Sequence, residues 1–367
     1  MALTLTLDQV RLLRARAQRL AKPVAGSTVA VAELVRHLVG VQAQDATAAA
    51  LALRARCAGL VMADVERARV DERSIVRTWV MRGTLHHVPS DDLGWLLGLL
   101  GPIFIRASRG RRAQLGLDDA TGERAVTALR AVLAEHGPST RDEIVQWLAG
   151  HGIELAGQAR PHLLGLAALQ GLVCHGPLRG RQPTYVLVAD WIDPCATLPR
   201  DEALARLAQR YLAAFAPARP EDLATWSGLS LTDARASWQA ISRQLIEAQV
   251  GESTVWLLKV QAEWLDLTPQ PPAVRLVPGF ENYLLGYRSR DLILTSVHAR
   301  KVCTGGGMLH PVLLVDGRGA GTWKLERGRK ATDVIVEPFE ELTDEVRHGL
   351  AAETDDVIRF VASETAR

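Results

Sequence analysis

The chain has 367 residues, of which 48% are hydrophobic and 23% are charged, and its formal net charge is +2. This is the composition of an ordinary soluble globular protein, with room for two or three domains or one elongated assembly. The small net charge neither requires nor excludes a polyanionic partner, so the distribution of charge matters more than its sum.

The sequence shows no pattern typical of export, membrane insertion or a structural metal. The N-terminal stretch MALTLTLDQVRLLRARAQ becomes charged too early for a signal peptide. The most apolar stretch, residues 94–105, is too short to span a bilayer, and its Gly and Pro predict a core helix that runs into a turn. The four cysteines are scattered without CxxC spacing. We therefore expect a reduced, cytoplasmic protein that carries no metal and no cofactor.

The N-terminal region, residues 1–120, predicts helices followed by strands. A helix is expected over 8–21, and strands are expected over 75–80 and 84–88. On the second strand His86 and His87 would point to opposite faces, so we expect one to pack inward and the other to be solvated. This order of elements predicts a first winged-helix-like unit, meaning a helix-turn-helix followed by a β-wing.

Within that region, GVQAQDA (40–46) joins a helix expected from about Val29 to Val41 to another expected from about Ala46 to Cys57. Asp45 can cap the second helix, because its carboxylate can accept from the free N–H groups of residues 47 and 48. Gln42 and Gln44 then lie in the junction. They are either surface filler or the working groups of a site that needs no strong acid or base, and the spacing by itself favours filler.

Two later segments repeat each other, at 125–150 and 203–228. In both, a proline follows an amphipathic helix and a tryptophan follows nine residues later, Pro138 with Trp147 and Pro217 with Trp226. A further helix is expected next, in 160–173 and in 230–250, and then a β-rich run, in 183–191 and in 253–260. We interpret residues 121–196 and 197–265 as second and third winged-helix units.

The C-terminal part, residues 266–367, predicts a β-rich domain, because short β-branched runs are separated by Gly and Pro. The stretch 313–325 predicts a hairpin with its turn at Asp316-Gly317. The stretch TGGGMLH (304–310) is expected to be a loop and not a phosphate cradle, since it does not lie between a strand and a helix. The fold class is therefore α+β, mainly helical.

Basic residues gather in residues 270–330, where ten Lys or Arg stand against four Asp or Glu. Residues 104–114 add four arginines. Clusters of this kind in a nearly neutral chain are typical of a face that binds a phosphate backbone, although any single run is more often a solvated surface. Arg318 lies between two glycines and either enters a minor groove or belongs to an ordinary exposed turn. The candidate DNA-binding residues are Arg288, Arg290, Arg318, Lys324, Arg327, Arg329 and Lys330.

Several ordered motifs resemble one protein family. They are LLRARAQRL (12–20), LVGVQAQDATAAALALRAR (38–56), RTWVMRGTLHHV (77–88), PEDLATWSGL (220–229), ENYLLGYRSR (281–290) and VLLVDGRGAGTWK (312–324). In combination they resemble the winged-helix DNA glycosylases of the AlkZ and YcaQ (AlkX) type over nearly the whole chain. The resemblance implies three tandem winged helices and a C-terminal β-domain that form a concave DNA-binding scaffold. It also implies a basic β-hairpin, here Asp316 to Lys324.

Gln42-Ala43-Gln44 matches the Gln-x-Gln signature of the AlkZ-like branch, so the resemblance implies that Gln42 and Gln44 are catalytic. It implies a monofunctional DNA glycosylase that acts on N7-alkylated purines, including bulky adducts and interstrand cross-links, in self-resistance or alkylation repair. Its partner would be double-stranded DNA, and we expect a monomer. The alternatives are a non-catalytic winged-helix regulator and a protein-interaction scaffold.

Overall fold

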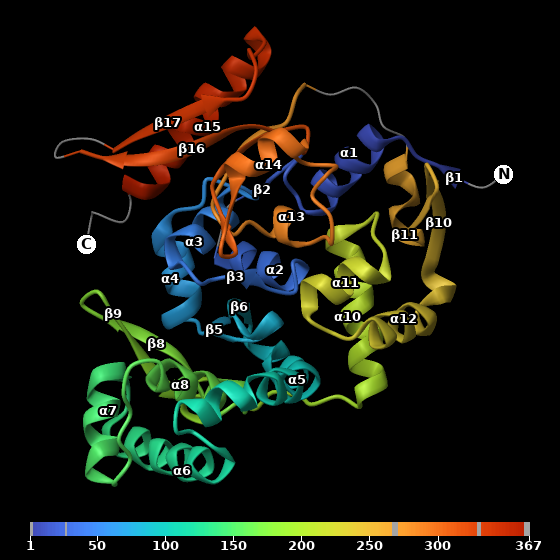
Figure 1. Ribbon diagram of the computed structural model, residues 1–367. Coiled ribbons are helices and arrows are strands. Elements are labelled where there is room, and N and C mark those ends of the chain that lie inside the picture. Colours follow the sequence, from blue (N-terminus) through green and yellow to red (C-terminus); the bar gives the residue numbers. More distant parts are fainter. Residues whose placement is uncertain (1–2, 26–27, 266–270, 329–331, 363–367) are drawn as a thin grey trace. The chain divides into compact units, whose positions relative to one another are not determined.

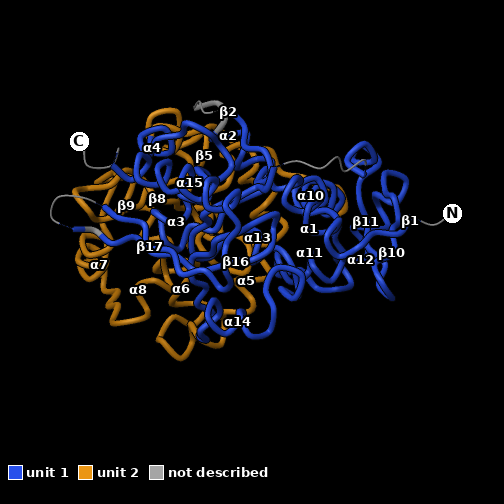
Figure 2. Tube along the Cα trace, turned by 90° about the horizontal axis from the view of Figure 1, so that it is seen from above, with its two compact units in different colours: residues 1–66, 204–367 blue, residues 67–203 orange. Residues whose placement is uncertain are grey.

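The computed structural model describes residues 3–25, 28–265, 271–328 and 332–362 (Figure 1). The chain forms two compact units, one of residues 1–66 together with 204–367 and the other of residues 67–203 (Figure 2). Helices dominate, and several small sheets accompany them, so the predicted α+β, mainly helical class is confirmed. The domain boundaries after residues 120, 196 and 265 stay a prediction.

The N-terminal part of the first unit is mostly helical. Its first helix begins with a capping box, in which the Thr6 hydroxyl accepts from the Gln9 N–H and the Gln9 side chain accepts from the Thr6 N–H. The second helix ends at His37 and not at Val41 as predicted, because Val39 has a left-handed φ of 64° that cannot continue a right-handed helix. The elements are α1 (Leu7–Ala17), β2 (Val24–Ala25), α2 (Thr28–His37), β3 (Val41–Gln42), α3 (Ala46–Arg54) and β4 (Cys57–Ala58).

The middle of the chain returns to this unit with the predicted order of three helices and a strand hairpin. Its core is aromatic: the rings of Tyr211 and Phe215 lie 4.8 Å apart, and Trp226 lies 5.3 Å from each of them. The helix expected over 230–250 is wrong in its last part, because residues 245–250 pair as a strand with the next run. The elements are α10 (Arg200–Phe215), α11 (Pro220–Ser227), α12 (Leu231–Ala240), β10 (Leu245–Val250) and β11 (Ser253–Leu258).

The C-terminal part combines a four-stranded antiparallel sheet, in the order β12-β15-β16-β17, with a long helix. The predicted hairpin is confirmed, since Asp316 and Gly317 have φ of 50° and 76°, as a tight hairpin turn requires. The glycine-rich stretch expected to be a loop instead forms the hairpin β13–β14. Helix α15, which was not predicted, packs on β12 and β17. The elements are β12 (Val274–Val277), α13 (Asn282–Leu285), α14 (Ser296–Val302), β13 (Cys303–Gly305), β14 (Met308–Leu309), β15 (Val312–Val315), β16 (Arg318–Arg327), β17 (Thr332–Pro338) and α15 (Asp344–Ala362).

The second unit contains strands in the order β6-β5-β8-β9-β7. Helix α5 continues through Pro102, so the turn expected there is wrong. Its apolar face, including Leu96 and Leu100, is buried and holds the helix together. The segment from α6 to β9 again has three helices and a strand hairpin, as the repeat predicts. The elements are β5 (Ile75–Trp79), β6 (Leu85–Pro89), α5 (Leu93–Gln114), α6 (Asp119–His136), β7 (Ser139–Thr140), α7 (Arg141–Gly150), α8 (Ala159–Leu169), β8 (Val173–Arg179), β9 (Gln182–Leu187) and α9 (Val188–Trp191).

Three histidines are buried in the second unit. His86 and His87 on β6 are both buried, so the expectation that one of them is solvated is wrong, because both faces of this strand are covered. His175 on β8 lies between Trp79 and Tyr185, at ring distances of 5.6 and 4.7 Å. Burial lowers the pKa of His86 and of His175 to about 3, and it lowers the pKa of His87 well below its usual value.

We expect the free energy of unfolding to fall as the pH is lowered from about 6.5 toward 3. In this window an unfolded histidine binds a proton and these buried histidines do not, so each one favours unfolding by about 1.4 kcal/mol per pH unit. Urea denaturation at several pH values measures the slope. His175→Phe should lower the slope by about one proton, whereas His151→Gln, at an exposed position, should not. Equal slopes in wild type and His175→Phe would contradict this account.

Candidate active site

The Gln42-Ala43-Gln44 motif begins at the last residue of the short strand β3 and ends shortly before helix α3. The two glutamines differ in environment, because Gln42 is buried, with 9% of its surface exposed, and Gln44 is exposed. Ala43 between them is fully buried. Gln44 is therefore the one of the two that a large substrate can reach most directly.

The backbone before the motif is strained. Val39 is a β-branched residue with a left-handed φ of 64°, a conformation that such residues rarely adopt. Its side chain is fully buried, and its N–H donates to the Arg36 carbonyl at 3.1 Å. Packing therefore maintains the turn that connects the end of α2 to the start of β3. Strain of this kind persists only where the surrounding structure enforces it, and it is frequent at functional sites.

Asp45 caps helix α3, as the sequence predicted. Its Oδ1 accepts from the Ala48 N–H at 3.0 Å, which is one of the two groups expected. The cap fixes the residue at which the helix begins. It therefore also fixes the position of the backbone that directly follows Gln44.

The side chain of Asn282 contacts the motif from a segment 240 residues away in sequence. Its Nδ2 donates to the Gly40 carbonyl at 2.8 Å, and its Oδ1 accepts from the Gln42 N–H at 3.4 Å. Asn282 is buried and opens helix α13. Asn282 belongs to the ENYLLGYRSR motif (281–290), and no local sequence pattern predicted a role for this asparagine.

A buried ion pair lies beside Asn282. Arg56, just beyond helix α3, donates through Nη2 to Glu281 Oε1 at 2.5 Å, and both side chains are fully buried. The same guanidinium donates to the Gln18 and Ala52 carbonyl oxygens and to Gln18 Oε1, at 2.8 to 3.0 Å. Breaking such a pair leaves an uncompensated buried charge, which is strongly destabilising. The pair therefore holds the segment that carries Asn282 against the end of the helix that follows the motif.

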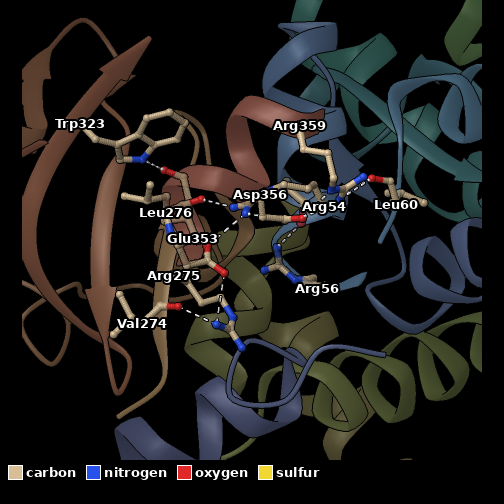
Figure 3. Close-up of polar contacts among 12 residues, drawn as sticks. Arg54, Arg56, Leu60, Val274, Arg275, Leu276, Trp323, Glu353, Asp356 and Arg359 are labelled. Carbon is tan, nitrogen blue, oxygen red and sulfur yellow. Dashed lines mark hydrogen bonds and ion pairs between the residues drawn. The ribbon is translucent and has the colours of Figure 1, made fainter. Parts of the chain in front are cut away.

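A second charged cluster holds the C-terminal end of α3 (Figure 3). Arg54 is fully buried and contacts Glu353 at 3.1 Å and Asp356 at 3.0 Å, both from helix α15. It also donates to the Leu276 carbonyl at 2.7 Å, and Glu353 accepts from the Leu276 N–H at 3.0 Å. Arg275 adds a further contact to Glu353 at 3.2 Å. Helix α3 is thus fixed at both ends, by the Asp45 cap and by this cluster.

The candidate DNA-binding residues lie in different surroundings. Arg318 and Lys324 are exposed, with Glu340 at 3.9 Å and Glu326 at 2.6 Å, and the hydrogen bond to Glu326 raises the pKa of Lys324. Arg288 is exposed, whereas Arg290 is half-buried and donates to a backbone carbonyl at 2.9 Å. The other three are Arg327, whose backbone ends β16, and Arg329 and Lys330, which lie outside the described residues.

The Asp316-Gly317 turn of the expected basic hairpin packs against its own unit. Asp316 Oδ1 accepts from the Ala273 N–H at 2.9 Å, and a Cβ at position 317 would collide with the Tyr283 hydroxyl. The adjoining strands β16 and β17 pair over Gly321–Arg327 and Thr332–Pro338 (Figure 1). The exposed Lys324 lies on strand β16, away from the Asp316-Gly317 turn.

The described residues contain neither a candidate metal site nor a candidate membrane-spanning helix. No group of three or more His, Cys, Asp or Glu side chains there could hold a metal ion. No helix in the same part of the chain is long and apolar enough to cross a membrane.

Comparison with known proteins identifies the family. Residues 35–360, which include the motif and Asn282, match the family model described as DNA glycosylase AlkZ-like. The chain is 31% identical over 329 residues, 84% of each chain, to an interstrand DNA cross-link repair glycosylase of Streptomyces sahachiroi. The solved structure of the Streptomyces sahachiroi DNA glycosylase AlkZ matches with a TM-score of 0.82 at 26% identity, over 100% of this chain and 98% of that one. The chain therefore belongs to the AlkZ-like DNA glycosylases, which are hydrolases of N-glycosyl bonds.

Proposed function

We propose that this glycosylase hydrolyses the N-glycosidic bond of N7-alkylated purines, including bulky adducts and interstrand cross-links, and that Gln42 and Gln44 are its catalytic residues. The observation that carries the proposal is the Gln-Ala-Gln motif, held rigidly at a strand-to-helix junction in a chain of this family. The Streptomyces sahachiroi relative named for cross-link repair supports the inclusion of cross-links. The role that follows is protection of DNA from alkylating agents, including self-resistance in a cell that makes one.

The chemistry explains why neutral side chains suffice. A purine alkylated at N7 carries a positive charge, so its bond to the sugar is already weakened and the base leaves readily. The enzyme then has to place a water against C1′ and stabilise a developing oxocarbenium ion, which is a task of positioning and electrostatics. A glutamine amide offers an acceptor oxygen for the water and a dipole for the cationic sugar.

The different exposure of the two glutamines suggests a division of roles. Gln44 is exposed, which supports a role in which its amide contacts the sugar and the attacking water. Gln42 is mostly buried, and its backbone N–H is held by Asn282. In the proposed mechanism it orients the same water from the interior side of the motif. A site on the surface also accepts wide adducts that could not enter a tight base-flipping pocket.

Replacing Gln44 by alanine should lower the single-turnover rate of base release by about tenfold to a thousandfold, because one water-positioning contact is lost. The assay is release of 7-methylguanine from alkylated duplex DNA with enzyme in excess. DNA affinity, measured separately, should change little. Gln209→Ala, at an exposed position outside the motif, is the control and should leave the rate unchanged. Equal rates for wild type and Gln44→Ala would remove Gln44 from the mechanism.

Asp45 can be separated from catalysis by its capping role. Asp45→Asn keeps a side-chain oxygen for the Ala48 N–H and should retain both stability and rate. Asp45→Ala loses the cap and should lower the free energy of unfolding by about 0.5–2 kcal/mol. Thermal denaturation and the same single-turnover assay measure the two effects. A large loss of rate in a fully folded Asp45→Asn would instead show that the carboxylate takes part in the reaction.

The basic residues on and after β16 are proposed to hold the duplex. If Lys324 contacts a phosphate, Lys324→Ala should weaken DNA binding and reduce the slope of log K against log salt by about 0.9. Glu326→Gln removes the carboxylate that contacts this lysine, so it should strengthen binding. Fluorescence anisotropy over a salt series measures both. If neither variant changes the affinity or the slope, β16 does not contact the backbone.

A further inference from the structure

We propose that Asn282 is a positioning residue for the glycosylase reaction. Its side-chain amide fixes the backbone of Gly40 and Gln42 and thereby sets where the Gln42 and Gln44 side chains lie. The inference rests on the catalytic role proposed above for the two glutamines. Asn282 itself is buried, so it acts through the motif and not on the substrate.

The contact requires a donor and an acceptor on one short side chain. Nδ2 donates to the Gly40 carbonyl and Oδ1 accepts from the Gln42 N–H, so the amide bridges two backbone groups on either side of Val41. Asparagine supplies both functions in a fixed plane. An ionised aspartate would place an acceptor oxygen, in place of the Nδ2 donor, against the Gly40 carbonyl. Alanine would leave both buried backbone groups without this partner.

Each of the two segments that meet at this contact contains a residue with a strained backbone conformation. Val39, next to Gly40, has a φ of 64°, and Phe280, two residues before Asn282, has a φ of 56°. Non-glycine residues hold left-handed values of this kind only where the surroundings enforce them. The Asn282 bridge is close in sequence to both strained residues and connects their two segments, so it is placed to maintain the conformation of the motif.

Asn282 is in turn held by its neighbour. The Arg56–Glu281 pair is fully buried, and Glu281 Oε1 also accepts from the Tyr283 N–H at 3.2 Å. The start of helix α13 therefore cannot move without breaking a buried ion pair. Supporting contacts of this kind locate reacting groups to within a fraction of an ångström.

The composition of the chain adds an independent observation. Asn282 is its single asparagine. Elsewhere in the same unit a buried amide is supplied by Gln261, which accepts from the Leu258 N–H at 2.9 Å and donates to the Leu212 carbonyl at 3.1 Å. The shorter asparagine side chain is used where the two bridged groups belong to the motif segment.

The first test is Asn282→Ala. The single-turnover rate of 7-methylguanine release should fall by about tenfold to a hundredfold, because a small displacement of the positioned groups has a large effect on rate. The affinity for alkylated duplex should change less than twofold. Circular dichroism gives the folded fraction, to which the rate is normalised.

The second test distinguishes positioning from a loss of stability. In Asn282→Asp, a protonated carboxyl can donate to Gly40 and accept from Gln42, whereas the ionised form cannot donate. The rate relative to wild type should therefore be near one at low pH and fall up to tenfold per pH unit as the new carboxyl ionises. Gln261→Glu is the matched control, since it makes the same amide-to-acid change at another buried bridge. Its relative rate per folded molecule should not depend on pH.

The outcomes separate this inference from the proposed function. Full activity of folded Asn282→Ala, or a pH-independent ratio for Asn282→Asp, would overturn the positioning role. A pH-dependent ratio in Gln261→Glu equal to that of Asn282→Asp would do the same. If Gln44→Ala is inactive while Asn282→Ala is fully active, only the positioning inference fails. If Gln44→Ala is fully active, the catalytic role proposed for Gln44 fails.

Discussion

The buried ion pair between Arg56 and Glu281 is the interaction on which the candidate site depends. The two residues are 225 positions apart in the sequence, and both side chains are fully buried. Charges removed from water must be paired, so the pair tolerates one relative placement of its two segments. Arg56 lies just after helix α3, which follows the motif, and Glu281 is directly before Asn282. The pair therefore brings an early and a late part of the chain together in the geometry that the motif requires.

Helix α3 follows the motif and anchors its C-terminal side. Asp45 caps its start, and Arg54, near its end, contacts two carboxylates of helix α15. The C-terminal helix thus stabilises the far end of the helix that begins just after the motif. A helix fixed at both ends positions the residues that adjoin it more accurately than a free loop does.

The proposed reaction suits such a site because it asks for accurate placement and little proton transfer. The damaged base carries its own leaving-group activation, so the protein has to orient a water and face a developing positive charge. An exposed amide at Gln44 and a mostly buried one at Gln42 provide two oxygens with different exposure to solvent. The strained Val39 indicates that this placement is maintained against a local conformational cost.

Local signals in the sequence determined much of this description. Helical spacing and the capping chemistry of Asp45 predicted the start of α3. The Asp316-Gly317 pair predicted the hairpin of β15 and β16. Ordered motifs pointed to the family. Tertiary structure alone decided that Asn282 meets the motif, because no local pattern predicts a hydrogen bond across 240 residues. It also decided that α2 stops before Val41, because packing around a neighbouring strained residue outweighed the helical propensity of the segment.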